Sequence, residues 1–152
     1  SCRPQLLIAD EPTTALDVTI QAQILRLLRD LQKQFDISVI LITHNLGVVA
    51  QTCDRLAVLY AGRVAEIGTT KDIFNNPQHP YTRGLMNAIP KPGSRGKKMA
   101  AIPGTVPSNP GVVTGCPFAP RCEFVFDRCH SETPALIKVN EIHQSACFLV
   151  NQ

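Results

Sequence analysis

The chain has 152 residues and a hydrophobic fraction of 44%, which allows one modest domain or two small ones and excludes a chain that is disordered as a whole. Its formal net charge of +3 and its pI of 8.6 lie below the values of a strongly basic nucleic-acid binder. No apolar run approaches the roughly 18 residues that a membrane span requires.

The first predicted element is a short strand over residues 5–9 that ends in two adjacent carboxylates, Asp10 and Glu11. A continuous apolar run is typical of a parallel strand covered on both faces, and ligands of open α/β sheets bind at the carboxyl ends of such strands. Pro12 ends the strand because it has no N–H to donate. Two acids there are costly unless they serve a hydrated magnesium ion and a water to be activated. An ordinary acidic turn is the alternative.

A helix follows, with Asp17 or Thr19 as its N-cap and Asp36 at its end. Its apolar residues recur at helical spacing and form one stripe: Ile20, Ile24, Leu27, Leu28, Leu31 and Phe35.

Residues 37–42 are a β-branched apolar run and predict a second strand. A strand, a helix and a strand within about forty residues predict a right-handed βαβ unit with parallel strands. Their carboxyl ends then lie side by side, which places His44 near Asp10 and Glu11.

Further short elements are predicted before residue 89. Gly62 suits the turn of a hairpin because it can adopt positive φ, Thr70 can cap a helix, and Pro80 suits a first helical position. The predicted elements are a helix over 46–51, strands over 55–60 and 63–67, and helices over 71–74 and 80–88.

The composition changes after residue 89. Eight of the twelve prolines lie between Pro90 and Pro134, and a segment without periodicity cannot bury much of its own surface. We therefore predict a first domain over residues 1–89 and an irregular appended module over 90–152. Its basic cluster contains no aromatic residue and indicates a solvated loop: Lys91, Arg95, Lys97 and Lys98.

Three segments resemble motifs of the ABC-type ATPases. Residues 10–17, Asp-Glu-Pro-Thr-Thr-Ala-Leu-Asp, resemble the Walker B segment and the D-loop, and residues 41–45, Leu-Ile-Thr-His-Asn, resemble the switch-histidine loop. Residues 76–82, Asn-Pro-Gln-His-Pro-Tyr-Thr, and the C-terminal cysteines resemble the extension of ATP-binding subunits of oligopeptide and dipeptide importers. The resemblance runs from Ser1 to about Gln152 and implies an α/β fold, namely part of the parallel sheet of a P-loop NTPase with flanking helices.

The phosphate-binding loop G-x-x-x-x-G-K-[ST] of such ATPases does not occur in these residues, nor do their signature and Q-loop segments. We expect them ahead of Ser1, in a longer subunit. The chain by itself is therefore expected not to hydrolyse ATP at a meaningful rate.

The resemblance implies a role for each polar residue at the strand ends. Asp10 would hold magnesium and with it ATP, Glu11 would polarise the attacking water, and His44 would contact the γ-phosphate and align that water. The alternative for a histidine after a strand is a helix cap or a core residue. Asp17 belongs by resemblance to the D-loop that reaches a second ATPase subunit, and it can serve as N-cap as well.

Four of the six cysteines lie near the C-terminus with five, six and seventeen residues between them: Cys116, Cys122, Cys129 and Cys147. Structural zinc usually pairs cysteines at C-x₂₋₄-C, so these spacings favour a [4Fe–4S] cluster, which the resemblance also implies. Zinc is the alternative, with His130 or His143 as a substitute ligand, and disulfides are a third interpretation. Cys2 and Cys53 are expected to stay apart from this centre.

The sequence is interpreted as the C-terminal part of the ATP-hydrolysing subunit of an ABC importer for peptides or related solutes such as nickel complexes. The resemblance implies a head-to-tail second ATPase subunit, transmembrane permease subunits and, indirectly, an extracytoplasmic solute-binding protein. The subunit would be peripheral at the cytoplasmic face of the membrane, with no nucleic-acid partner. One alternative is a stand-alone iron–sulfur or zinc module without ATPase activity. A DNA-repair or chromosome-maintenance ATPase is another, but it predicts coiled-coil heptads that the chain lacks.

Overall fold

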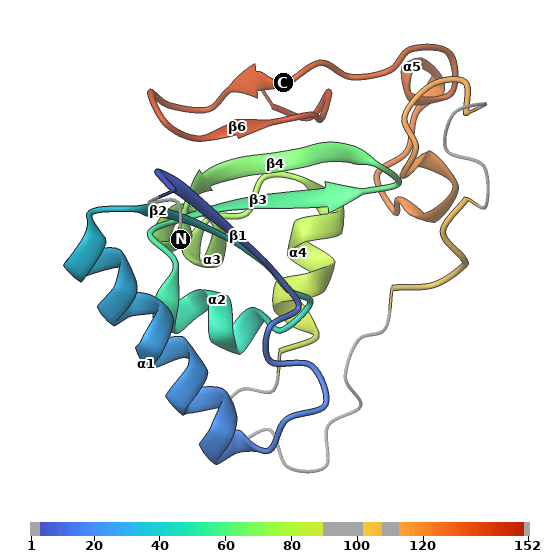
Figure 1. Ribbon diagram of the computed structural model, residues 1–152. Helices are drawn as coiled ribbons and strands as arrows, with labels where there is room; N and C mark the ends of the chain where they lie inside the picture. Colours follow the sequence, from blue (N-terminus) through green and yellow to red (C-terminus); the bar gives the residue numbers. More distant parts are fainter. Residues whose placement is uncertain (1–3, 90–101, 108–112, 151–152) are drawn as a thin grey trace. The chain divides into compact units, whose positions relative to one another are not determined.

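The computed structural model describes residues 4–89, 102–107 and 113–150 (Figure 1). The chain divides into two compact units, residues 1–53 and residues 54–152. None of the helices in the described ranges is long and apolar enough to cross a membrane. Cys2 and the basic cluster defined above lie outside the described residues.

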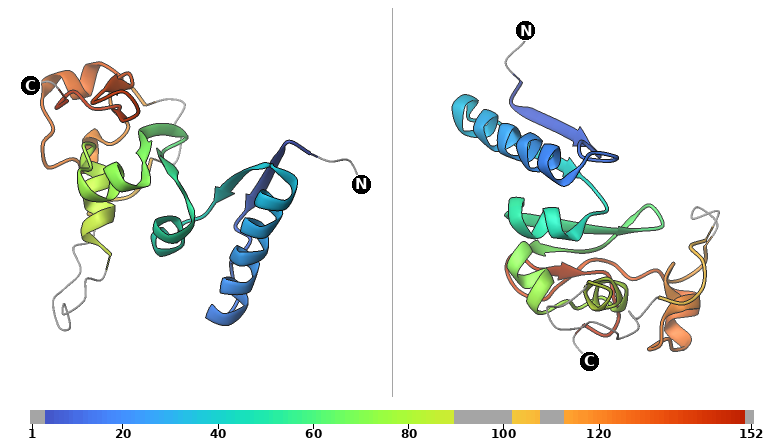
Figure 2. Two further views of the ribbon diagram at one scale, coloured as in Figure 1. Left: turned by 90° about the vertical axis from the view of Figure 1, so that its left-hand side faces the viewer. Right: turned by 90° about the horizontal axis from the view of Figure 1, so that it is seen from below.

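The first unit contains the predicted βαβ arrangement. Strand β1 (Leu6–Asp10) pairs in parallel with β2 (Ser38–Ile42), and the last residues of the two strands are opposite each other in the register. Helix α1 (Val18–Phe35) connects the strands and runs alongside them (Figure 2), and α2 (Leu46–Thr52) follows β2. The prediction of two parallel strands with adjacent carboxyl ends is confirmed.

Both ends of α1 have local causes in the sequence. The Asp17 side chain accepts hydrogen bonds from the backbone N–H groups of Thr19 and Ile20 at 2.9 and 3.0 Å, which satisfies two donors that have no intrahelical acceptor. Asp36 takes the left-handed conformation with φ 50° and ends the helix. Of the two predicted N-caps, Asp17 is confirmed.

The prediction that β1 is covered on both faces is wrong for the described part of the chain. Leu6 and Ile8 are 46% and 60% exposed, whereas the alternate residues Leu7 and Ala9 are half-buried. Side chains alternate between the two faces of a strand, so in the described part of the chain one face of β1 is half-buried and the other is exposed.

The second unit is built on a four-stranded antiparallel sheet in the order β3-β4-β6-β5. The hairpin of β3 (Arg55–Tyr60) and β4 (Arg63–Thr69) turns at two residues with positive φ, Ala61 and Gly62, as predicted. The other two strands are β5 (Ile137–Lys138) and β6 (Gln144–Ser145), and β6 lies between β4 and β5 and pairs with both. The appended module thus contributes to the same sheet as the hairpin, and the domain boundary at residues 89/90, which stays a prediction, falls inside this unit.

The helices of the second unit are short: α3 (Thr70–Asn75), α4 (Pro80–Asn87), α5 (Asp127–Ser131) and the 3₁₀ helix η2 (Ala119–Arg121). Thr69, and not the predicted Thr70, caps α3. Its hydroxyl accepts a hydrogen bond from the backbone N–H of Asp72 at 3.0 Å and donates one to the Asp72 carboxylate at 2.7 Å. The helix begins one residue earlier than predicted because this reciprocal capping uses Thr69.

Aromatic packing attaches the appended module to the hairpin. Tyr60 of β3 lies 4.7 Å from Tyr81 of α4 and 5.2 Å from Phe118, measured between ring centroids. Arg121 donates hydrogen bonds to the Tyr60 hydroxyl at 3.2 Å and to the carbonyl oxygens of Ile102 and Pro103. The segment between two of the clustered cysteines is therefore held against β3 by both apolar and polar contacts.

Candidate functional site

The carboxyl ends of β1 and β2 bring Glu11 and His44 together. The backbone N–H of Glu11 donates to the carbonyl of Ile42, the last residue of β2, at 2.9 Å. Glu11 has φ 43°, a left-handed conformation that is uncommon for a residue with a side chain. Such strain persists only where the surroundings determine the conformation, and it clusters at functional sites.

Two side chains engage the Glu11 carboxylate. His44 Nδ1 lies 3.0 Å from Oε1, and the Thr14 hydroxyl donates a hydrogen bond of 2.7 Å to Oε2. The Thr14 hydrogen bond, followed by the His44 hydrogen bond, holds the pKa of Glu11 below its ordinary value. An ionised carboxylate only accepts hydrogen bonds, so Nδ1 of His44 carries the proton that it shares with Glu11.

The helix-cap interpretation of His44 does not hold, because its neighbour Asn45 has that role. The Asn45 side chain accepts hydrogen bonds from the backbone N–H groups of Gly47 and Val48 at 3.0 and 3.3 Å, and its own N–H donates to the Thr43 hydroxyl. The His44 side chain is 76% exposed, so it is not a core residue either. Its surroundings leave the imidazole available at the strand ends.

The other predicted residues of this site lie on the same segment. Asp10 is the last residue of β1 and is exposed, and its carboxylate is the kind of oxygen ligand that magnesium prefers. Asp17 lies at the start of α1 as its N-cap. Sequence reasoning missed Thr14; the tight turn that begins at Glu11-Pro12 was the available signal, because a turn returns the fourth residue to the first.

The four clustered cysteines line one small cavity of about 20 Å³ in the second unit. Cys116 and Cys122 flank η2, Cys129 lies on α5, and Cys147 follows β6. The backbone N–H of Cys116 donates to the carbonyl of Cys129 at 2.8 Å and ties two of these segments together. The cavity wall also contains His79, which sequence reasoning did not connect with the cysteines.

The cysteines around this cavity form no disulfide, so the disulfide interpretation finds no support among the described residues. Burial, followed by smaller effects that include the neighbouring thiols, raises the pKa of Cys116, Cys122 and Cys147. These thiols stay protonated at neutral pH unless a cation displaces their protons.

No group of three or more His, Cys, Asp or Glu side chains within the described residues has an arrangement that could hold a metal ion. The cysteines are gathered around one cavity without being brought to the close mutual contact that a single ion requires. The donor set suits a thiolate-bound metal, but the predicted metal centre is not borne out by this geometry.

Neither predicted substitute ligand lines the cavity. His143 is 1% exposed, and its Nε2 lies 2.6 Å from Oε1 of the fully buried Glu66. Glu66 also accepts hydrogen bonds from the backbone N–H groups of Gln78 and His79 at 2.7 and 2.9 Å. His143 therefore serves a buried polar contact between β4 and the segment before β6, and His130 is exposed on α5.

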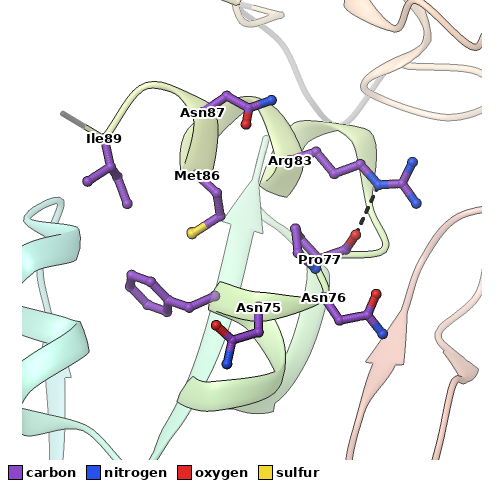
Figure 3. Close-up of a pocket in the computed structure, with 8 residues that line it drawn as sticks. Asn75, Asn76, Pro77, Arg83, Met86, Asn87 and Ile89 are labelled. Carbon is purple, nitrogen blue, oxygen red and sulfur yellow. Dashed lines mark hydrogen bonds between the residues drawn. The ribbon is translucent and has the colours of Figure 1, made fainter. Parts of the chain in front are cut away.

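A second and larger cavity, of about 580 Å³, opens between α3 and α4 (Figure 3). Arg83 crosses its margin and donates a hydrogen bond of 2.9 Å to the carbonyl of Pro77. Amide and apolar side chains form the remainder of the wall: Phe74, Asn75, Asn76, Met86, Asn87 and Ile89. None of the predicted catalytic or metal-binding residues lines this cavity.

Comparison with known proteins finds similarity to proteins of peptide import. The family model described as the oligopeptide/dipeptide transporter C-terminal region matches residues 65–129. The chain is 52% identical to a putative peptide import ATP-binding protein of Brucella ovis and 53% identical to the dipeptide transport ATP-binding protein DppD of Bacillus subtilis. It is also 53% identical to the oligopeptide transport ATP-binding protein OppD of Salmonella typhimurium.

These matches include 97%, 99% and 97% of this chain, but only 45%, 45% and 44% of the respective relatives. The chain therefore spans less than half the length of the curated relatives that it matches. The similarity to these peptide-import ATP-binding proteins extends through both compact units of the chain.

Proposed function

We propose that this chain forms the C-terminal part of an ATP-hydrolysing subunit that drives peptide import through an ABC transporter. The observation that carries the proposal is the Glu11–His44 contact of 3.0 Å at the carboxyl ends of two parallel strands. The names of the relatives, which refer to peptide, dipeptide and oligopeptide transport, support peptides as the transported class.

In the proposed reaction, Glu11 accepts a hydrogen bond from a water and polarises it for attack on the γ-phosphorus of ATP. The water oxygen forms a bond to phosphorus while the bond to the bridging oxygen of ADP breaks, and the products are ADP and inorganic phosphate. His44 holds the Glu11 carboxylate and contacts the γ-phosphate. Asp10 would hold Mg²⁺, whose charge offsets that of the phosphates.

The partners in this proposal are those that the resemblance to ABC-type importer ATPases implies. Asp17, at the start of α1, would contact a second ATPase subunit bound head-to-tail, in addition to its role as N-cap. Transmembrane permease subunits would transmit the ATPase cycle to the peptide pathway, with an extracytoplasmic solute-binding protein supplying the peptide. The subunit would act as a peripheral protein at the cytoplasmic face of the membrane.

Substitutions at Glu11 and His44 test the catalytic assignment in a complete subunit that contains this chain. Glu11→Gln should still bind ATP and dimerise but lose turnover, and His44→Ala should behave similarly because the carboxylate loses its aligned partner. ATP binding and steady-state hydrolysis are measured side by side. Normal turnover in either variant would show that the catalytic residues are misassigned.

We further propose that the four clustered cysteines hold a [4Fe–4S] cluster, with zinc as the alternative. Their convergence on one cavity and their wide spacing support the cluster, which would act as a structural staple in a module with little apolar core. Anaerobic purification with iron, sulfide and zinc analysis tests this. Stoichiometric zinc would replace the cluster by the alternative, and the absence of any metal under anaerobic conditions would exclude both.

The stand-alone metal-binding module is less well supported than the ATPase subunit. The relatives match nearly the whole chain, including the segment from Asp10 to His44 that such a module would not need. An iron–sulfur module without ATPase function therefore explains only the second unit.

A further inference from the structure

We propose that Thr14 is a positioning residue for ATP hydrolysis, holding the second oxygen of the Glu11 carboxylate in the orientation that the attacking water requires. This inference rests on the proposed function, in which Glu11 polarises the water. It concerns a hydroxyl group to which neither the sequence motifs nor the similarities assign a role.

Geometry places the Thr14 hydroxyl directly against the Glu11 carboxylate. The backbone N–H of Thr14 donates to the carbonyl of Glu11 at 3.1 Å and closes a turn over residues 11–14. This turn returns the Thr14 hydroxyl to the carboxylate, where it donates a hydrogen bond of 2.7 Å to Oε2. His44 contacts Oε1 instead, so the two oxygens of Glu11 are held from two different segments of the chain.

Two contacts on different oxygens fix the plane of the carboxylate, which one contact would leave free to rotate. A carboxylate has about four lone-pair positions, and Thr14 and His44 use one on each oxygen. One lone pair on each oxygen therefore remains for a water. The anchored backbone of Glu11, with its N–H bound to Ile42, reinforces the same fixed orientation.

A purely structural role explains the Thr14 hydroxyl poorly. Thr14 is exposed, and the Glu11 side chain is 45% exposed. Water could replace a hydrogen bond between exposed groups with little effect on folding. What water could not replace is a defined orientation, and misplacing a reacting group by even about 1 Å can cost about a hundredfold in rate.

The test uses a complete peptide-import ATP-binding subunit whose corresponding part is this chain. Thr14→Val removes the hydroxyl and keeps the branched shape, and Thr14→Ser keeps the hydroxyl. We expect Thr14→Val to lower kcat for ATP hydrolysis by about tenfold or more while KM for ATP stays within about twofold. Thr14→Ser should remain within about threefold of the unsubstituted kcat.

Two further variants make the outcome specific. Thr105→Val makes the same substitution at an exposed threonine of the second unit and should leave kcat unchanged. Glu11→Gln tests the proposed function itself: if it keeps turnover, the catalytic assignment fails, and the role of Thr14 fails with it. If Glu11→Gln abolishes turnover but Thr14→Val keeps its kcat, only the inference about Thr14 is overturned. An effect of Thr14→Val on KM alone, or a kcat that Thr14→Ser does not restore, would also overturn it.

Discussion

Acidification should destabilise the second unit through His79. This side chain is 4% exposed, and its Nδ1 accepts the backbone N–H of Tyr81 at 3.0 Å, which caps α4. Burial lowers the pKa of His79 from 6.5 to about 4, and the contribution of Glu66, which acts in the opposite direction, is smaller. A proton on Nδ1 would also remove the acceptor that the helix uses.

The direction and size of the effect follow from the two pKa values. Between about pH 6.5 and about pH 4 the unfolded chain binds a proton at His79 that the folded chain does not. The stability is therefore fully present above pH 6.5 and is lost as the pH falls towards 4. A difference of about 2.5 between the pKa values, at 1.36 kcal/mol for each unit, corresponds to about 3 kcal/mol.

Urea unfolding across this pH range measures the effect. His79→Asn keeps a side-chain acceptor suited to an N-cap but cannot take up a proton. We expect the free energy of unfolding to fall by about 3 kcal/mol more in the unsubstituted chain than in His79→Asn. His130→Asn, which replaces an exposed histidine on α5, is the matched control and should keep the full pH dependence. Equal pH dependence in the chain and in His79→Asn, or an NMR titration of His79 near pH 6.5, would refute the reasoning.

Three further predictions concern the described contacts. Glu66→Gln should lower the free energy of unfolding, measured in urea, by about 3 kcal/mol, because the new amide N–H₂ would face a backbone N–H donor where a carboxylate oxygen accepted a hydrogen bond. Glu141→Gln, at an exposed position, should change it by less than about 0.5 kcal/mol. Equal effects of the two substitutions would contradict the buried contact. Asp17→Ala should cost about 1 kcal/mol by loss of the α1 cap, measured by thermal unfolding, and an unchanged melting temperature would contradict this. Because burial raises the pKa of Cys122 and Cys147, the free energy of unfolding of the metal-free chain should decrease as the pH rises above 9.0, and it should decrease less in Cys122→Ser. A free energy of unfolding that does not change with pH in this range would contradict the burial of these thiols.

The sequence alone determined the local elements and their order in the segment from Asp10 to His44. Helical spacing, the Asp17 cap and the Pro80 start act within a few residues of the chain, so the sequence is sufficient to predict α1 and α4. The prediction that His44 lies near Glu11 also succeeded, because parallel strands of one βαβ unit place their carboxyl ends at the same edge. A cap assignment one residue away, at Thr70, failed because two adjacent threonines offer the same hydroxyl.

Only the tertiary structure decided which distant segments meet. The buried contact between Glu66 and His143 joins residues 77 positions apart, and no periodicity or spacing in the sequence predicts it. The same holds for the pairing of β6 with β4 and for the approach of His79 to the cysteine cavity. Such contacts depend on where an irregular chain returns to the sheet, which is decided by burial and by the need of each buried polar group for a partner. Local patterns carry no information on either requirement.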